Sequence, residues 1–274
     1  MQDRVTGSKD AAAADLIEER RGPIAVLTLN RPKARNGLSL ALMQALTAAV
    51  TRLSADRDVA AVIIAANGPA FCAGHDLKEL AAHRGDADGG RDFYDSAMTT
   101  CAGMMQAIIA SPKPFIAAVH GVATAAGCQL VATCDLAVAS EQASFATPGV
   151  NIGLFCSTPM VALSRNVPRK RAMEMLLLGE ELPASVAADY GLVNRVVPHD
   201  RVLDEALELS QRIASKSPLT VAIGKEAFYR QVEMPTADAY RYAADVMVRN
   251  MVARDAEEGI GAFIEKRKPE WKGC

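Results

Sequence analysis

The sequence predicts a layered α/β fold with a mainly parallel sheet, followed by a helical C-terminal region. Two stretches, Ile63–Leu77 and Ile116–Leu130, share one pattern: an apolar strand, a glycine-containing turn, a loop, a glycine and the start of a helix. Successive units of this kind stack into parallel sheets covered by helices. After Pro198 the pattern changes to amphipathic helical spacing. We therefore expect a core over residues 16–198 and a helical region over residues 199–274.

Strands and helices alternate at the start of the predicted core. Leu16–Arg20 and Ile24–Leu29 form a predicted strand pair around a Gly-Pro turn. Ser39 is expected to cap a helix, because its hydroxyl precedes apolar residues at helical spacing. An apolar strand over Val59–Ile64 follows, and the next helix opens near Asp76.

The middle of the chain continues the alternation after one polar interruption. Ala82–Asp95 is rich in Gly, Asp and Arg, which predicts a mobile loop. The elements expected after it are a helix over Ser96–Ala110, a strand over Phe115–Val119, a helix over Ala126–Thr133, and short strands over Leu136–Ala139 and Ser144–Phe145. Asp135 follows the second of these helices, where the helix dipole disfavours a carboxylate, so we expect it to have a hydrogen-bonding partner.

Composition excludes several classes of protein. Lys and Arg number 30 and Asp and Glu number 32, so the net charge of −2 gives no support for nucleic-acid binding. No apolar run reaches the roughly 18–20 residues that a membrane span needs. Residues 1–15 lack the apolar stretch of a secretory signal and contain three acidic residues, unlike a transit peptide. We interpret them as a disordered leader.

The cysteines and histidines give no indication of a metal site. The six cysteines form no CxxC pair and are scattered along a long apolar chain, as buried free thiols are in a reducing compartment. The four histidines form no HxxxH or HExxH pattern. We therefore expect a cytoplasmic protein without a bound metal.

Four segments carry a resemblance to a known family. GPAFCAGHDLKEL (Gly68–Leu80) and KPFIAAVHGVATAAGCQL (Lys113–Leu130) resemble the two signature segments of the enoyl-CoA hydratase/isomerase, or crotonase, superfamily. LTLNRPKARNGLS (Leu27–Ser39) resembles its first motif and FIEKRKP (Phe263–Pro269) its C-terminal one. The segments occur in the family's order over roughly residues 16–271.

The resemblance implies a spiral of ββα units followed by a helical trimerisation region, often paired into a dimer of trimers. Members bind acyl-CoA thioesters of fatty acid metabolism, and coenzyme A is part of the substrate, so no separate cofactor is expected. They stabilise an enolate through two backbone N–H groups, which fall here on His75 and Ala126. Helix starts suit this chemistry, because their free N–H groups and the helix dipole favour a developing oxyanion.

The resemblance also assigns residues to the coenzyme A moiety. Lys and Arg suit its phosphates, and the helix starts suit the thioester oxygen. The family's loop that touches the nucleotide matches Lys33, Ala34 and Arg35. The segment that lines the pantetheine and adenine path matches His75, Asp76, Leu77 and Lys78. The C-terminal helix, which in some members comes from a neighbouring subunit, supplies Phe263 and Lys266.

The sequence departs from the hydratase pattern at the acid/base positions. Hydratases carry two glutamates there, whereas this chain has Gln129 and Gly149. Neither residue can act as a general base, because an amide does not titrate and glycine has no side chain. His75 and Cys156 are candidate substitutes for the missing acid/base group. The alternative for His75 is a turn residue without a catalytic role, and the alternative for Cys156 is an inert apolar thiol. Installing Glu at both lost positions is expected to raise hydration.

Three functions stay open on these grounds. The first is an enoyl-CoA hydratase-like lyase, which converts 2-enoyl-CoA to 3-hydroxyacyl-CoA. The second is a non-catalytic acyl-CoA-binding paralogue. The third is a reaction that needs no enzymic base, such as acyl-CoA decarboxylation, for which Ala73–Asp76 (AGHD) is a resemblance to methylmalonyl-CoA decarboxylases. Phe145–Pro159 resembles a sub-group of mitochondrial hydratase-domain paralogues that also lack the two glutamates.

Overall fold

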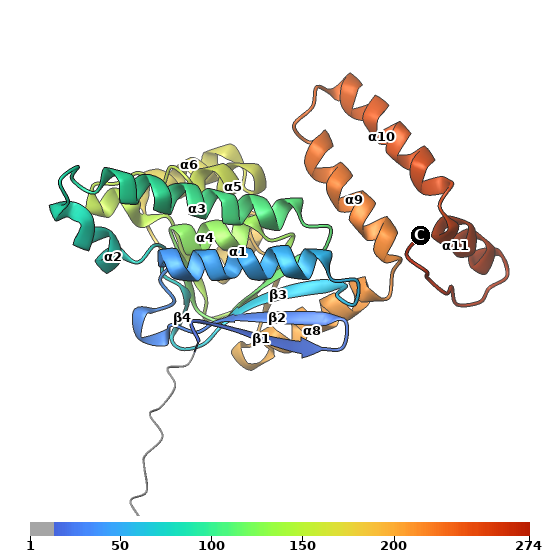
Figure 1. Cartoon of the computed structure of the whole chain (residues 1–274), viewed down its shortest axis with the longest axis horizontal. Coiled ribbons are helices and arrows are strands. Elements are labelled where there is room, and N and C mark those ends of the chain that lie inside the picture. Colours follow the sequence, from blue (N-terminus) through green and yellow to red (C-terminus); the bar gives the residue numbers. More distant parts are fainter. Residues whose placement is uncertain (1–13) are drawn as a thin grey trace, which may run out of the picture.

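The computed structural model describes residues 14–274 and has the predicted α/β architecture (Figure 1). Residues 1–13 of the expected leader lie outside the described residues. The main sheet has six strands in the spatial order β1 (Leu16–Arg21), β2 (Ile24–Leu29), β3 (Ala61–Ala66), β5 (Phe115–Val119), β7 (Leu136–Ser140) and β10 (Arg195–Val197). Only β1 is antiparallel to its neighbour, and the other four pairs are parallel.

A second, smaller sheet is formed by short strands that follow the strands of the main sheet along the chain. Its order is β4 (Ala70–Cys72), β6 (Val122–Thr124), β8 (Ser144–Ala146) and β9 (Leu182–Pro183). Strands β4, β6 and β8 run parallel to one another, so each repeat contributes one strand to each sheet. This arrangement is the ββα spiral that the resemblance implies.

Helices cover both faces of the main sheet, as parallel sheets require. The core helices are α1 (Leu40–Ala55), α2 (Leu77–Ala82), α3 (Arg91–Ala110), α4 (Ala126–Thr133), α5 (Pro159–Asn166), α6 (Arg169–Leu178) and α7 (Ala184–Asp189). Short 3₁₀ helices are η1 (Pro32–Ala34), η2 (His83–Gly85), η3 (Pro148–Ile152) and η4 (His199–Arg201). Alternate residues of β2 divide between the faces: Leu27 packs with the cluster of α1, α3 and α4, and Val26 packs with α8 (Val202–Ala214).

Most expected elements are confirmed, and β3 is shifted by two residues. Ser39 accepts a hydrogen bond from Leu42 N at 3.2 Å and caps α1, as expected. The strand expected over Val59–Ile64 spans Ala61–Ala66, because β3 pairs residue for residue with β2 starting at Ile24.

The prediction of a mobile loop over Ala82–Asp95 is wrong. This segment contains η2 and the first turn of α3, which begins at Arg91 rather than Ser96. The carboxylate of Asp88 accepts hydrogen bonds from Gly90 N at 2.9 Å and Asp92 N at 2.7 Å. Asp88 therefore supplies an acceptor for a free N–H group in the first turn of α3.

Beyond α8 the chain forms an arm that extends away from the core (Figure 1). The arm consists of α9 (Pro218–Gln231), α10 (Thr236–Met251) and α11 (Arg254–Ile264). The domain division at residue 199 stays a prediction, since α8, which follows it, packs on the core sheet. No helix between residues 14 and 274 is both long and apolar enough to cross a membrane.

Asp135 has the partners that its position required. One carboxylate oxygen accepts hydrogen bonds from Phe115 N and from Lys225 Nζ, both at 2.7 Å, and the other accepts from Tyr229 OH at 2.9 Å. Lys225 also donates to the carbonyl oxygens of Ile108 and Lys113, each at 2.9 Å. These bonds fix the base of the arm to the core.

Candidate active site

The start of α4 lies against the end of β4 in a close backbone approach. A methyl group on Gly127 would overlap the carbonyl oxygen of Cys72, so only glycine permits this contact. Ala125, just before the helix, has φ 49° and ψ −117°, a conformation that is unfavourable for a residue with a side chain. Strain maintained by close packing is a feature of functional sites. The turn at Ala125 places Ala126 N close to Gly74, the residue before His75.

His75 presents its peptide to the same place. Leu38 N donates to Gly74 O at 2.7 Å and Asp76 N donates to Leu38 O at 3.1 Å, forming a parallel bridge between Leu38 and His75. In such a bridge the N–H of His75 itself points away from the partner strand. Among residues 14–274, turns, loops and caps contain no backbone hydrogen bond that is donated by His75 N or by Ala126 N.

The two donors are close together. A methyl group on Gly74 would lie 2.9 Å from Ala125 Cβ and 3.5 Å from Ala126 N. Ala126 is also the first residue of α4, so its N–H has no acceptor four residues earlier in the helix. His75 and Ala126 therefore both lack an acceptor for their N–H groups among the bonds outside the helices and strands of residues 14–274, and the segments that carry them lie in contact.

The imidazole of His75 is neutral in this setting. Burial lowers the pKa of His75, and Nε2 has no hydrogen-bond partner in the described part of the chain. A neutral ring can accept a proton, but no carboxylate orients it, as the usual general-base histidine requires.

The two positions of the family glutamates differ in the space around them. Gln129 is buried in the first turns of α4, and its Oε1 has no partner among residues 14–274. A methyl group on Gly149 would lie 2.9 Å from both Cys156 Sγ and Leu154 O. The second position is therefore closed, because the thiol and a backbone carbonyl occupy the space that a side chain needs. Burial raises the pKa of the Cys156 thiol, so it stays protonated.

The loop of Lys33, Ala34 and Arg35 and the segment around His75 are held together. Lys33, Ala34 and Arg35 are exposed at η1 and lie beside residues 73–76. Ala73 N donates to Arg35 O at 3.0 Å, which fixes this arrangement. The structure thus brings together the three loop residues and the His75 segment that the sequence predicted.

Asp76 organises the start of α2. Its carboxylate accepts from Lys78 N at 3.1 Å and from Glu79 N at 3.3 Å, and it forms a 2.9 Å ion pair with Arg31. Burial raises the pKa of Asp76, but the hydrogen bonds and the Arg31 charge outweigh it and lower the pKa overall. Leu77 and Lys78 are exposed beside this cap and are free to contact a ligand.

Phe263 and Lys266 are not brought to this site in one chain. Both are exposed, Phe263 at 85%, and they lie at the end of α11. Figure 1 shows α11 at the opposite end of the molecule from α2. Their assignment to coenzyme A stays a prediction that requires a neighbouring subunit.

Two polar residues near the site were missed by sequence reasoning. Asn36 is buried; its side chain accepts from Arg31 N and donates to Asn67 O and Ala70 O, each at 2.8 Å. Its left-handed backbone, φ 55°, is one that Asn tolerates, but it leaves no periodic pattern in sequence. Thr147, two residues before Gly149, is fully buried, and its hydroxyl has no partner among the described residues.

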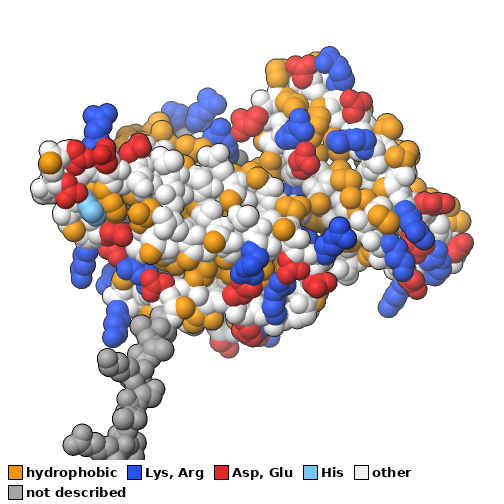
Figure 2. Space-filling model, viewed as in Figure 1, with side chains coloured by type: hydrophobic (Ala, Val, Ile, Leu, Met, Phe, Trp, Pro, Cys, Tyr) orange, Lys and Arg blue, Asp and Glu red, His pale blue; other side chains and the backbone are white. Residues whose placement is uncertain are grey.

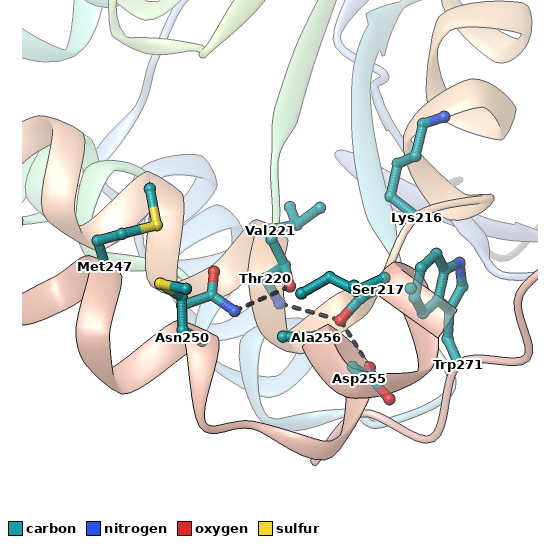
Figure 3. A pocket seen from close by; sticks show the side chains of 12 residues that line it. Lys216, Ser217, Thr220, Val221, Met247, Asn250, Asp255, Ala256 and Trp271 are labelled. Carbon is teal, nitrogen blue, oxygen red and sulfur yellow. Dashed lines mark hydrogen bonds between the residues drawn. The ribbon is translucent and has the colours of Figure 1, made fainter. Parts of the chain in front are cut away.

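A hollow of the surface lies in the arm. It has a volume of about 500 Å³ and is largely apolar. Figure 3 shows Ser217 between Thr220 and Asp255 at its wall. Its lining comes from the start of α9, the end of α10, α11 and the C-terminal tail, including Val221, Met247, Met251, Ile260 and Trp271.

Two further observations concern metals and cysteines. Residues 14–274 contain no group of three or more His, Cys, Asp or Glu side chains placed to hold a metal ion. All six cysteines are free, and five are buried as expected, whereas Cys274 is exposed.

Comparisons with known proteins agree with the resemblance. The profile of the enoyl-CoA hydratase/isomerase family matches residues 19–274. Rat enoyl-CoA hydratase domain-containing protein 3 is 48% identical over 245 residues, which cover 89% of this chain and 80% of that protein. The crystal structure of a Mycobacterium smegmatis enoyl-CoA hydratase is 50% identical, with a TM-score of 0.90 over 94% of this chain and 99% of that one. The human domain-containing protein 3 structure is 46% identical, with a TM-score of 0.89 over 94% and 100%.

The expected cytoplasmic location is corrected by these relatives. The rat, mouse and human proteins are all designated mitochondrial. This finding overturns the expectation that the cysteine pattern supported. Thiols buried in a large core are shielded from oxidants, so they do not distinguish one compartment from another.

The family assignment rests on agreement between sequence, fold and site. The profile match covers almost all of the described residues. The two sheets and the helical C-terminal region match the solved structures over nearly their whole length. The chain belongs to the enoyl-CoA hydratase/isomerase family.

Proposed function

We propose that this chain binds acyl-CoA thioesters and stabilises their enolate form, but hydrates 2-enoyl-CoA slowly or not at all. The thioester oxygen accepts from the N–H groups of His75 and Ala126, with the nucleotide beside Lys33 and Arg35. The chain is hydratase-like in its binding groups and lacks the acid/base pair. The fold family and the free donors support the first part of this proposal.

The closed space at Gly149 carries the second part. A lost glutamate can leave an open position, which water or a neighbouring carboxylate then uses. Here Cys156 Sγ and Leu154 O fill that position. The thiol is a poor base because burial raises its pKa.

The expected cost in rate follows from the missing groups. One oxyanion donor lowers the barrier by roughly 3–4 kcal/mol, and that contribution persists in this chain. Each general acid or base contributes about 10²–10⁴-fold, and both contributions are absent here. Binding is therefore retained while most of the rate advantage for hydration is lost.

Hydration of crotonyl-CoA by the purified protein tests this proposal, with binding measured calorimetrically in the same sample. We expect crotonyl-CoA to bind and its turnover to be far below the about 10 s⁻¹ typical of enzymes. A turnover at that level would contradict the proposal, and its loss in His75→Ala would identify the substitute base. Absence of binding to acetyl-CoA, crotonyl-CoA and octanoyl-CoA would contradict the thioester site itself.

Restoring the acid/base pair needs one change more than the two glutamates. Gln129→Glu with Gly149→Glu places the second side chain against Cys156, so this double variant is expected to stay slow. Adding Cys156→Ala removes the thiol but leaves Leu154 O beside the new side chain, so hydration is expected to rise only in part above the double variant. Cys156→Ala alone is the matched control, because it removes the thiol without adding a carboxylate.

A further inference from the structure

Arg31 lies directly before η1, and its side chain reaches the segment around His75. Its guanidinium forms a 2.9 Å ion pair with Asp76, the residue after His75, and donates to the carbonyl oxygen of Gly37. Only 20% of the Arg31 side chain and 15% of the Asp76 side chain are exposed, so solvent screens this pair weakly. The guanidinium is a planar and rigid fork, so it holds its two acceptors at a fixed spacing.

The two groups that the guanidinium holds lie on the two sides of the backbone bridge that contains His75. Leu38, the residue after Gly37, donates from its N–H to Gly74 O at 2.7 Å, and its carbonyl oxygen accepts from Asp76 N at 3.1 Å. A methyl group on Gly37 would lie 3.5 Å from Asp76 Cα, so the two segments are in close contact there. Movement of the His75 peptide relative to Leu38 would therefore strain or break the contacts of the guanidinium.

The backbone of Arg31 fixes the other end of the proposed ligand site. Its carbonyl oxygen accepts from Ala34 N at 3.0 Å and from Asn36 N at 2.9 Å, and its N–H donates to Asn36 Oδ1 at 2.8 Å. These bonds hold the loop of η1, whose Lys33 and Arg35 bind the nucleotide in the proposed function. One residue thus joins the loop for the nucleotide to the segment that carries a donor for the thioester oxygen.

We propose that Arg31 is a positioning residue, which sets the His75 N–H at the distance from the loop of η1 that an acyl-CoA thioester requires. It acts through Asp76 and does not touch the reacting atoms. The inference rests on the proposed function, because the thioester oxygen must accept from His75 N for the position of this group to matter. A rigid fork suits the task, since functional groups must be held within about 0.5 Å of the productive geometry.

Two ligands that differ only at the thioester carbonyl measure the donor. Calorimetry on the full-length chain would compare acetyl-CoA with S-ethyl-CoA, in which a methylene group replaces the carbonyl. We expect the unaltered chain to bind acetyl-CoA about tenfold more tightly, the effect of net hydrogen bonds to its oxygen. Arg31→Gln should lower this affinity ratio about fivefold, because the His75 N–H is no longer held at the oxygen. Loosening of the loop of η1 weakens both ligands alike, so it cancels in the ratio.

The carbonyl stretching frequency of bound acetyl-CoA gives a second readout that does not depend on affinity. Hydrogen bonds to a carbonyl oxygen weaken the C=O bond and lower its infrared frequency, which difference spectra with isotope-labelled acetyl-CoA detect. We expect this lowering to be smaller in Arg31→Gln than in the unaltered chain. A general loss of stability would not move the frequency in the fraction of the protein that binds the ligand.

Asp76→Asn tests the path from Arg31 to His75. Asparagine can still accept from Lys78 N and Glu79 N and so keeps the cap of α2, but it lacks the charge that pairs with Arg31. It should lower the affinity ratio as Arg31→Gln does. The double variant should be no worse than either single variant, because both remove the same contact, and additive losses would overturn the inference. If Arg31→Gln does not fold, Asp76→Asn carries the test by itself.

Asp15→Asn is the matched control at the same guanidinium. Asp15 Oδ2 lies 3.3 Å from Arg31 Nε, and its side chain is 50% exposed. This variant removes a charge beside Arg31 and leaves the contacts to Asp76 and Gly37, so both readouts should be unchanged. An equal loss in Asp15→Asn would overturn the inference, because the effect would then follow the charge around Arg31 rather than its contact with Asp76.

The outcomes separate this inference from the proposed function. An affinity ratio and a carbonyl frequency that are unchanged in both Arg31→Gln and Asp76→Asn would overturn this inference and leave the proposed function standing. Failure of both ligands to bind the unaltered chain, or equal affinities of that chain for the two, would instead overturn the proposed function, and this inference with it.

Discussion

Lys225 on α9 donates a 2.7 Å hydrogen bond to Asp135, which directly follows the last turn of α4. The lysine is buried, and its remaining hydrogens are directed to the carbonyl oxygens of Ile108 and Lys113. The two charges are 90 residues apart in sequence, so this pair joins the arm to the segment that follows α4. Burial lowers the pKa of Lys225, and the Asp135 charge opposes that effect.

Removing Lys225 should destabilise the protein. Lys225→Met leaves the Asp135 carboxylate partly buried without its cation, so we expect a loss of about 3 kcal/mol in the free energy of unfolding, measured by urea denaturation. Arg230→Ala is the control on the same helix, because it removes an exposed pair with Glu226. That variant should lose less than about 1 kcal/mol. Equal losses in the two variants would contradict the anchoring role of Lys225.

A methyl group at Gly127 should disturb the site and the fold together. Gly127→Ala would force α4 away from Cys72 O, and we expect a loss of at least about 3 kcal/mol together with weaker thioester binding. Gly103→Ala in α3 is the control, because nothing lies within 4 Å of its added methyl group. It should gain roughly 0.5–1 kcal/mol, since alanine favours a helix more than glycine does. Normal stability of Gly127→Ala in thermal denaturation would argue against the close approach.

Acid should release the C-terminal tail from the arm. Burial raises the pKa of Asp255, but hydrogen bonds from Ser217, Lys272 N and Gly273 N outweigh it and lower the pKa overall. A lowered folded-state pKa means that this stabilisation is complete above the ordinary carboxyl pKa and is lost as pH falls through the folded value.

The single tryptophan reports that release. Trp271 Nε1 donates to Ser215 O at 2.9 Å, so its fluorescence should change when the tail detaches. We expect the change at acidic pH, before loss of the far-ultraviolet circular dichroism signal. Asp255→Asn should show the detached spectrum already at neutral pH. A pH transition that persists in Asp255→Asn would assign the effect to another group.

The apolar surface of the arm should be covered by other copies of the chain. Figure 2 shows hydrophobic side chains exposed among charged ones on this part of the molecule. Val252 is 81% exposed and Ile264 73%, and a monomer rarely leaves such a surface open. We expect light scattering to report a trimer or a dimer of trimers at micromolar concentration, and Val252→Glu to lower that mass. A mass of 29.0 kDa for the unaltered chain would contradict this expectation.

Sequence alone determined the elements whose signals are local. The apolar spacing after Ser39 predicts α1, and the strand–glycine–helix pattern predicts β5 and the start of α4. Caps, turn glycines and periodicity act within a few residues, so they can be read along one segment. The pairing of the nucleotide loop with the His75 segment followed from the order of the family's motifs.

Only the tertiary structure decided what surrounds those elements. Cys156 Sγ and Leu154 O close the space at Gly149, and Lys225 reaches Asp135 from the arm. Each of these relationships joins segments that approach only when the sheets stack and α9 docks. Steric closure and the lack of a hydrogen-bond partner depend on distances across that packing, which no pattern of residue types along the chain contains.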